Sequence, residues 1–285
     1  MHSQPGMIQK HNHSSSERFI VFSDLDGSLL DHETYDYAPA QEALDRLRLQ
    51  DIPLVLATSK TLEEVLDLMG ELDLAQPFII ENGGALVIPA DYFVPGEDAQ
   101  DAYDEIPLSA GVDELNAWLS AVQEEQGYSY RTMLDMSVLE VMDYTGLESG
   151  EAERAMMRRY TIPMVWQDSE ERLKDFGGRV RNCGWSLLRG GRFVHLQGRT
   201  DKARAMQECV RCFAGQGQEE ITTIALGDSE NDRGMLEVAD YAIVIRRSGG
   251  GYLQLTRDKE VYIPSQPGPS GWNEGLLHVL DKIQV

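Results

Sequence analysis

Two aspartates separated by one residue stand directly after a short apolar segment near the N-terminus. Residues 19–22 read FIVF, which predicts a buried strand, and Asp24 and Asp26 follow at its carboxyl end. Two carboxylates this close repel each other, so a stable core does not need them there. A bound cation or a phosphoryl-transfer centre would use both charges, and this pair is therefore a candidate catalytic site.

The other candidate residues also follow predicted strands or open a predicted helix. Thr58 and Lys60 end the apolar segment IPLVLATSK. Asp228 ends ITTIALGD, and Lys202 opens the helix-like segment KARAMQECVRCF. If these strands are neighbours in a parallel sheet, their carboxyl ends lie at one edge, where such sheets bind ligands. We expect further substrate-binding groups beside them: Gly27, Ser28, Ser59, Asn231 and Asp232.

These residue types fit the transfer of a phosphoryl group. Asp24 is suited to attack phosphorus as a nucleophile, which would give an aspartyl-phosphate. Asp26 would protonate the leaving alcohol and later deprotonate the attacking water. A Mg²⁺ ion held by Asp24, Asp26 and Asp228 would keep the carboxylates ionised and neutralise the phosphate. Lys202 would balance the remaining charge, and Thr58 would donate a hydrogen bond to a phosphoryl oxygen.

The elements that must position these residues alternate between strands and amphipathic helices over residues 18–84 and again over 196–285. This alternation predicts an α/β fold, a Rossmann-like doubly wound parallel sheet. Between them, residues 85–195 predict an inserted α+β domain, with strand-like segments such as SVLEVMDY and IPMVWQD. Residues 1–17 are polar, lack the apolar segment of a secretory signal, and predict a disordered tail.

The composition limits the classes of partner. The formal net charge is −23, from 25 basic and 48 acidic residues, which disfavours binding to nucleic acids or anionic membranes. An anionic ligand would therefore need a metal ion or a local group of basic residues. The chain has 3 cysteines, too few for a disulfide scaffold. We expect a cytoplasmic enzyme that acts on a small molecule.

The motifs in chain order resemble those of the haloacid dehalogenase superfamily of phosphotransferases. They are D-x-D-G-[ST], a threonine after the second strand, a lysine at a helix start and G-D-x-x-N-D. Membership implies a Rossmann-like core, dependence on Mg²⁺, an aspartyl-phosphate intermediate and a C2-type cap domain inserted after the third strand. Ser28 departs from the more usual threonine, but it also supplies a hydroxyl group.

A closer resemblance is to the mannosyl-3-phosphoglycerate phosphatases. The segments that carry it are SDLDGSLLD, ATSKT, ENGGAL, GRFVHL and PGPSGWNEGL. It implies hydrolysis of mannosyl-3-phosphoglycerate to mannosylglycerate, a compatible solute, and phosphate. The segment GRTDKARAM departs from the glycine-lysine-glycine pattern expected around the lysine.

Such a substrate has a carboxylate and a sugar that the core acids do not bind. Arg158 and Arg159 of the inserted domain are candidates for the carboxylate, since arginine binds carboxylates in a bidentate manner, although a solvated helix face is an equal alternative. The hydroxyl groups of the sugar have three candidate partners after the third strand: Glu81, Asn82 and Gly83. His195 either reaches the cleft or packs as a structural histidine.

Other functions remain open on the same residues. The substrate could be glucosyl-3-phosphoglycerate or another sugar phosphate. A phosphomannomutase-like phosphotransferase would use the same core and move the phosphate without releasing it. A sugar-phosphate sensor would bind the ligand without turnover, but it would not need both a nucleophile and a general acid.

Overall fold

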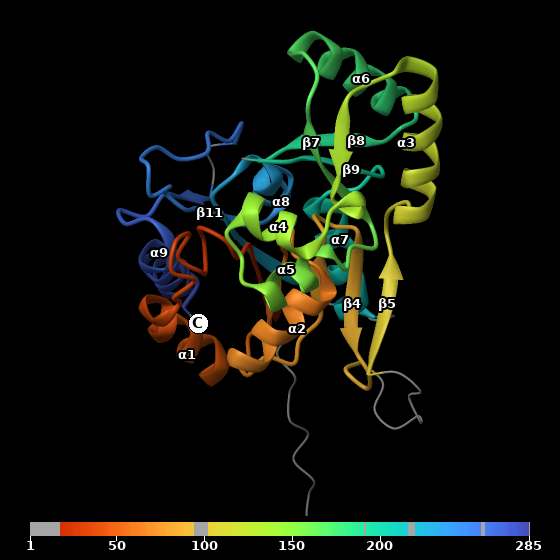
Figure 1. The fold of residues 1–285 in the computed structure, drawn as a ribbon. Helices are drawn as coiled ribbons and strands as arrows, with labels where there is room; N and C mark the ends of the chain where they lie inside the picture. The colour runs from red at the N-terminus through yellow and green to blue at the C-terminus, as the bar shows by residue number, and fades with distance from the viewer. Residues whose placement is uncertain (1–17, 94–101, 191, 216–219, 258–259, 285) are drawn as a thin grey trace, which may run out of the picture.

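The computed structural model describes residues 18–93, 102–190, 192–215, 220–257 and 260–284 (Figure 1). The tail expected over residues 1–17 lies outside them. The core holds a parallel sheet in the order β12-β11-β10-β1-β2. Its strands are β1 (Arg18–Ser23), β2 (Leu54–Leu56), β10 (Ile221–Gly227), β11 (Tyr241–Val244) and β12 (Val261–Tyr262).

Helices cover both faces of this sheet, as the alternation of strands and helices predicts. Side chains alternate along β1, so that Val21 packs on one face while Ile20 and Phe22 pack on the other. The face of Val21 is covered by α1 (Gln41–Leu49), α2 (Leu62–Glu71) and α9 (Gly268–Lys282). The opposite face is covered by α7 (Lys202–Ala214) and α8 (Arg233–Val238). The doubly wound α/β fold is therefore confirmed.

Side-chain caps fix where the helices near the sheet edge begin. Thr61 forms a capping box with Glu64 at the start of α2. Asp201 accepts a hydrogen bond from the backbone N–H of Arg204, so that α7 begins at Lys202. Short 3₁₀ helices are η1 (Ala38–Ala40), η2 (Met133–Asp135) and η3 (Glu230–Asp232).

The third strand leads into a second sheet rather than directly into the inserted domain. β3 (Phe78–Ile80) meets the first sheet through a bridge between Ala57 and Ile79, and then pairs antiparallel with β4 (Ala85–Pro89), which pairs with β5 (Tyr103–Pro107). Leu86 of β4 packs in the same cluster as Phe22. We therefore place β4 and β5 with the core, although the sequence analysis assigned residues 85–107 to the inserted domain.

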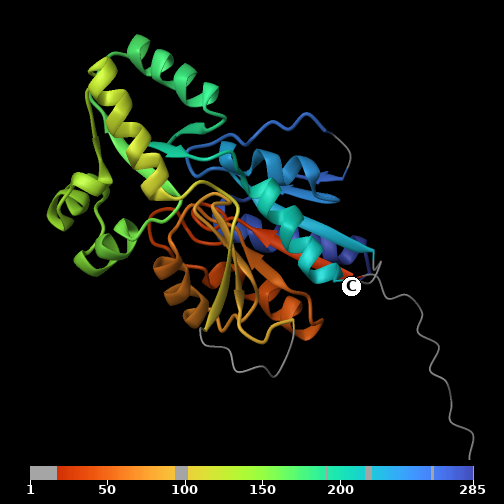
Figure 2. The same cartoon turned by 90° about the vertical axis from the view of Figure 1, so that its right-hand side faces the viewer.

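The inserted domain, called the cap domain below, projects from one side of the core (Figures 1 and 2). Its antiparallel sheet has the order β6-β7-β9-β8. The strands are β6 (Tyr130–Thr132), β7 (Thr161–Trp166), β8 (Ser186–Arg189) and β9 (Val194–Gln197). Helices α3 (Val112–Gln126) and α6 (Glu170–Asn182) pack on one face. Because β9 pairs with β7, residues 196 and 197 belong to the cap sheet and not to the core.

One expected strand of the cap domain is wrong. The segment SVLEVMDY forms α4 (Val138–Thr145), and α5 (Ser149–Met156) follows it and contacts α2 of the core. Ser137 and Glu140 form a capping box that starts α4, and Gly146 ends it in the left-handed region at φ 81°. These end signals outweigh the apolar alternation on which the strand prediction relied. Within the described residues no helix is long and apolar enough to cross a membrane.

Candidate active site

Three carboxylates meet at the carboxyl edge of the core sheet. β1 and β10 are paired neighbours with Ser23 opposite Leu226, which brings Asp24 and Asp228 together just beyond the strands. Asp232 joins them from η3, and one carboxylate oxygen of each of the three lies within 4.8 Å of the others. The sequence placed Asp24 and Asp228 at one metal site, and the structure brings both into this cluster.

Lys202 is the cation of the cluster and is fully buried. Its Nζ donates to Oδ1 of Asp24 and to Oδ1 of Asp232, each at 2.6 Å. Burial alone would lower the pKa of this ammonium group, but the charges of Asp232 and Asp24 outweigh burial and raise it. Lys202 therefore stays charged and fixes the position of the Asp24 carboxylate.

Asp232 holds the loop around the site and does not face an open cavity. Its Oδ2 accepts from the backbone N–H groups of Asp228 and Ser229 at 3.1 and 3.0 Å, while its Oδ1 binds Lys202. The sequence analysis expected Asp232 to bind the substrate. Its side chain is fully buried and both of its oxygens have protein partners, so the structure gives it a positioning role instead.

Asp24 lies among other carboxylates, and its own carboxyl group has a raised pKa. Burial, followed by repulsion from Asp232, raises its pKa to about 8, although Lys202 acts in the opposite direction. Burial and then Asp232 also raise the pKa of Asp228. A cluster with more carboxylates than cations is stabilised by a divalent ion, and carboxylate oxygens are the ligands that Mg²⁺ takes in proteins. The residues present thus fit a Mg²⁺ ion.

The side chain of Asp26 points to another group. Its Oδ1 lies 3.0 Å from Nζ of Lys60, and it is not part of the carboxylate cluster. Its role as a metal ligand therefore stays a prediction. Burial lowers the pKa of Lys60 and the charges of Asp26 and Glu64 raise it, with a net increase. Asp26 thus lies two residues from Asp24 and pairs with Lys60 rather than with the cluster, and a carboxyl group in this position can serve as a proton donor.

Hydroxyl and backbone groups complete the floor of the site. Thr58 is fully buried after β2, and its Oγ1 accepts from the backbone N–H of Lys60 at 3.2 Å. Oγ of Ser28 is buried and has no hydrogen-bond partner among the described residues, so it is available to a ligand. Gly27 has a φ of 80°, and a Cβ there would lie 3.1 Å from Oδ2 of Asp228, so a side chain would crowd the cluster.

The turn after β3 joins the site to the start of α7. Glu81, Asn82 and Gly83 all have positive φ, at 46°, 57° and 90°. A Cβ on Gly83 would lie 2.2 Å from the carbonyl oxygen of Asp201, so only glycine fits this approach. Oδ1 of Asn82 accepts from Nδ2 of Asn231 at 3.0 Å, which links this turn to the loop that carries Asp228.

Glu81 binds the cap domain and is not free to bind a sugar. It is fully buried, and its Oε1 accepts from the backbone N–H of Arg159 at 2.8 Å. Its Oε2 accepts from the N–H of Tyr160 at 3.2 Å and from Oγ1 of Thr161 at 2.6 Å. The expected role of Glu81 in sugar binding is thus replaced by a link between the core and β7.

The two arginines expected to bind the substrate carboxylate take part in the same junction. Nη1 of Arg158 donates to the carbonyl oxygen of Ser59 at 2.9 Å and to Oγ1 of Thr161 at 3.0 Å. The guanidinium group of Arg159 pairs with Glu63 at 2.9 Å and with Glu105 at 2.6 Å. These partners hold both side chains in the core–cap junction, so neither is placed as a ready carboxylate receptor.

His195 lies on the face of the cap sheet that carries Thr161. It pairs with Pro163 in β7 and with Leu188 in β8, and its Nδ1 is buried without a partner among the described residues. Burial, followed by the charge of Arg158, lowers its pKa to about 3. His195 is therefore a neutral group on the side of the cap that faces the junction.

A pocket of about 330 Å³ lies beside Lys60, at the junction of core and cap. Its lining includes Tyr35 and Arg154, which the sequence analysis missed because neither residue is part of a motif or a strand end. A second cleft of about 610 Å³ is lined by Asn82, Asn231 and cap residues such as Gln197.

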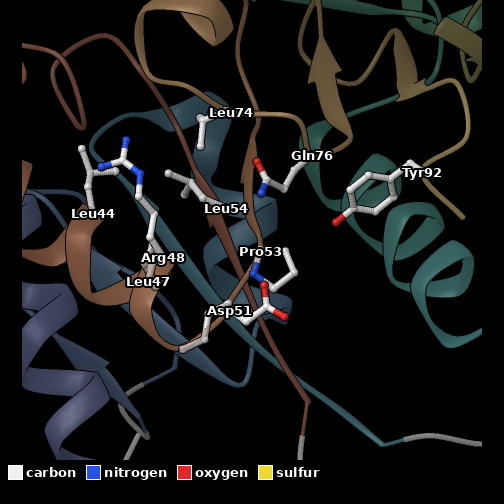
Figure 3. Close-up of a pocket in the computed structure, with 10 residues that line it drawn as sticks. Leu44, Leu47, Arg48, Asp51, Pro53, Leu54, Leu74, Gln76 and Tyr92 are labelled. Atoms are coloured by element: carbon white, nitrogen blue, oxygen red, sulfur yellow. The ribbon is translucent and has the colours of Figure 1, made fainter.

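A smaller pocket of about 90 Å³ lies at the other end of β2 (Figure 3). Leu54, Arg48 and Tyr92 line it, and Arg48 Nη2 donates to the carbonyl oxygen of Leu72 at 2.8 Å. It adjoins the amino end of β2, whereas Thr58 and the carboxylate cluster lie at the carboxyl end. This pocket is therefore not part of the candidate site.

Comparisons with known proteins identify the family of the chain. The family model described as haloacid dehalogenase-like hydrolase matches residues 21–157. A protein of Methanococcoides burtonii named glucosyl-3-phosphoglycerate/mannosyl-3-phosphoglycerate phosphatase is 32% identical, over 93% of this chain and 98% of its own length. A protein of the same name from Persephonella marina is 34% identical over the same shares.

Solved structures show the same fold at low identity. A HAD subclass IIB sugar phosphatase superposes with a TM-score of 0.61 at 18% identity, covering 93% of this chain and 98% of that one. A haloacid dehalogenase-like hydrolase from Bacteroides thetaiotaomicron has a TM-score of 0.64 at 18% identity, with shares of 94% and 100%. At these identities the likeness concerns the fold alone.

Proposed function

Because the chain belongs to the haloacid dehalogenase-like hydrolases, we propose that it is a Mg²⁺-dependent phosphatase that hydrolyses mannosyl-3-phosphoglycerate to mannosylglycerate and phosphate. The observation that carries this proposal is the buried pair of Asp24 and Lys202 beside Asp228, at the edge where such sheets bind ligands. The names of the relatives support the class of substrate. We place the reaction in the cytoplasm.

In the first half of the reaction, a carboxylate oxygen of Asp24 attacks phosphorus and the bond from phosphorus to the glyceryl oxygen breaks. Asp26 gives its proton to that oxygen, and mannosylglycerate leaves. Lys202, already 2.6 Å from Asp24, fixes the nucleophile and offsets negative charge. The hydroxyl groups of Thr58 and Ser28 donate to phosphoryl oxygens.

In the second half, Asp26 takes a proton from a water molecule that attacks the phosphorus of the aspartyl-phosphate, and Asp24 is released with inorganic phosphate. Asp26 thus ends protonated, as it began. When bound by Asp24 and Asp228, a Mg²⁺ ion supplies positive charge that lowers the pKa of the nucleophile and neutralises the phosphoryl group. The cap domain excludes bulk water over the site.

Glucosyl-3-phosphoglycerate is a second candidate substrate, because both relatives carry both substrates in their names. Mannose and glucose differ in the orientation of one hydroxyl group, which is a small difference for a binding site to distinguish. We therefore expect turnover of both compounds with a preference for the mannosyl one.

The test is phosphate release with Mg²⁺ from mannosyl-3-phosphoglycerate, glucosyl-3-phosphoglycerate, 3-phosphoglycerate, mannose 1-phosphate and nitrophenyl phosphate. The proposal expects the highest kcat/KM on the mannosyl compound. Release from nitrophenyl phosphate alone would keep the phosphatase and reject the substrate. Conversion of mannose 1-phosphate to mannose 6-phosphate without release of phosphate would favour a mutase.

A further inference from the structure

The direction of Asp26 indicates where the leaving group lies. A general acid must reach the oxygen that leaves, and the Asp26 carboxylate faces Lys60, which lines the pocket of about 330 Å³. We propose that this pocket, called the leaving-group pocket below, binds the glycosyl-glycerate part of the substrate, with Tyr35 against the sugar ring and Arg154 at the carboxylate. This inference rests on the proposed function and assigns the site that recognises the sugar and the carboxylate of the substrate.

Both the core and the cap domain build the leaving-group pocket. Its volume lies in the range of sites for small molecules. The core side comes from the segment after β1 and from α2, and the cap side comes from α5 and the turn before it. The lining from the core includes Leu30, Tyr35, Lys60 and Asp67, and the lining from the cap includes Leu147 and Arg154. A substrate held here touches both domains.

Tyr35 is an aromatic side chain that the fold presents to this pocket. Its backbone has a φ of 57°, its N–H donates to the carbonyl oxygen of Asp31 at 3.0 Å, and its side chain remains 47% exposed. Oδ1 of Asp31 accepts from the N–H of Thr34 at 2.9 Å, which fixes the turn. The centroid of the Tyr35 ring lies 5.2 Å from Nζ of Lys60. An exposed ring in a fixed turn offers an apolar face to the C–H groups of a sugar.

Arg154 supplies the charge for the carboxylate. It and Lys60 are the two cations among the described residues that line the pocket, whose lining also includes the carboxylates of Glu64, Asp67, Glu71 and Glu151, so a substrate carboxylate can bind only against one of these two cations. Lys60 already pairs with the general acid, whereas Nε of Arg154 pairs at 3.0 Å with Asp67, whose side chain is 59% exposed. The carbonyl oxygen of Arg154 accepts from Oγ1 of Thr61 at 2.9 Å, so the core fixes its backbone. Arginine binds carboxylates with two parallel hydrogen bonds. The substrate carboxylate can therefore bind Arg154 either together with Asp67 or in place of it.

The second cleft is the competing position for the leaving group. It is larger, at about 610 Å³, and its walls include polar side chains such as Asn82 and Gln197. However, Lys60, the partner of Asp26, lines the leaving-group pocket and does not line this cleft. A sugar bound there would not place the leaving oxygen beside Asp26, so we assign the leaving group to the pocket beside Lys60.

The experiment compares single variants of the full chain on three substrates with Mg²⁺. Mannosyl-3-phosphoglycerate has both the sugar and the carboxylate, 3-phosphoglycerate has only the carboxylate, and nitrophenyl phosphate has neither. The variants are Arg154→Gln, Arg154→Lys and Tyr35→Ala. Arg189→Gln is the matched control, because Arg189 also pairs with one carboxylate, Glu170 at 2.8 Å, on the cap surface away from the pocket.

Arg154→Gln is expected to raise KM about 10- to 100-fold on both glycerates, the range of one charged hydrogen bond, and to leave nitrophenyl phosphate within about twofold. Arg154→Lys should recover part of this loss. Tyr35→Ala should raise KM about 3- to 10-fold on the mannosyl compound alone. Arg189→Gln should change none of them.

Several results would overturn the inference. One is an effect of Arg154→Gln that is equal on nitrophenyl phosphate and on the glycerates. Another is a selective loss in Arg233→Gln, which changes the second cleft, without one in Arg154→Gln. If the unaltered protein releases no phosphate from the glycosyl compounds, the proposed function itself is rejected, and this result does not depend on the variants.

Discussion

The chemistry at the residue scale depends on Asp24 being held by Lys202 within an excess of negative charge. Because Lys202 also pairs with Asp232, replacing Asp24 by asparagine leaves the lysine with a partner and the fold intact. We therefore expect Asp24→Asn and Asp26→Asn each to lower kcat by about 10⁴-fold or more, as with other residues of covalent catalysis. Steady-state phosphate release measures this.

Asp45→Asn is the control for these variants, because Asp45 is an exposed acid on α1 that pairs with Arg48. It should keep full activity. Full turnover by Asp24→Asn would contradict the covalent mechanism, and binding of phosphate without turnover in this variant would agree with it.

His195 gives a second residue-scale prediction, on pH. Its pKa in the folded state is lowered to about 3, so the folded protein holds it neutral while the unfolded chain binds a proton near pH 6.5. The stability from this group is therefore present above the unfolded pKa and is lost as pH falls below it. We expect the free energy of unfolding of His195→Gln to depend less steeply on pH than that of the unaltered protein between about pH 6.5 and pH 4.5.

Urea denaturation at several pH values measures this difference. His278→Gln serves as the control, since His278 is exposed on α9 and stacks on Tyr262. Equal slopes in the unaltered protein and in His195→Gln would show that His195 does not titrate in this way.

The sequence was a good guide to residues whose role depends on where strands end. Asp24 and Asp228 could be chosen because each directly follows an apolar strand, and Lys202 because it opens a helix. The contacts of Glu81 and Arg158 could not be predicted, because their partners lie in the other domain and are set by how the cap docks. No local pattern carries that information.

At the element scale, the same distinction separates what could be predicted from what could not. The alternation of strands and helices was sufficient for the parallel sheet, since crossover connections permit few arrangements. It failed for β4, whose pairing with β3 depends on the turn at residues 81–84, and for β5, which pairs with β4. It also failed for α4, where apolar residues alternate by chance and the capping box decides the structure.

The junction between β3 and β7 leads to a prediction about Glu81. Alanine at this position would leave the N–H groups of Arg159 and Tyr160 and the hydroxyl of Thr161 without their acceptor. We expect Glu81→Ala to lower the free energy of unfolding by about 2–4 kcal/mol, because buried donors left unpaired are costly. Glu81→Gln keeps an acceptor oxygen and should cost less.

Thermal denaturation and limited proteolysis measure this effect, with Glu114→Ala on the exposed face of α3 as the control. If the junction holds the cap in place, Glu81→Ala should also speed cleavage within residues 108–200. Unchanged stability and cleavage would mean that the junction contributes little to cap docking.

At the scale of the whole molecule, a net charge of −23 surrounds a site that is itself rich in carboxylates. The long-range field therefore disfavours an anionic substrate, and local cations must outweigh it. Lys60, Lys202 and Arg154 lie at or beside the site, but each of them already pairs with a carboxylate. The remaining attraction must come from a bound divalent ion, so the net charge of the site depends on whether the metal is bound.

This leads to a prediction on the coupling of Mg²⁺ and pH. Without a metal ion the pKa of Asp24 is raised to about 8, so its contribution to stability is present below the unfolded pKa and is lost as pH rises through the folded pKa. Mg²⁺ binds the ionised carboxylate, so the proton on Asp24 opposes metal binding, and it does so less as pH rises. We expect the increase in Tm on adding Mg²⁺ to be larger near about pH 8 than near about pH 5.

Differential scanning calorimetry with Mg²⁺ or with a chelator measures both effects, and the chelator should also abolish activity. Asp228→Asn removes a cluster carboxylate, and it should lose most of the increase in Tm at both pH values. Asp45→Asn should behave as the unaltered protein does. An increase that is the same at both pH values, or that survives in Asp228→Asn, would place the bound ion away from the carboxylate cluster.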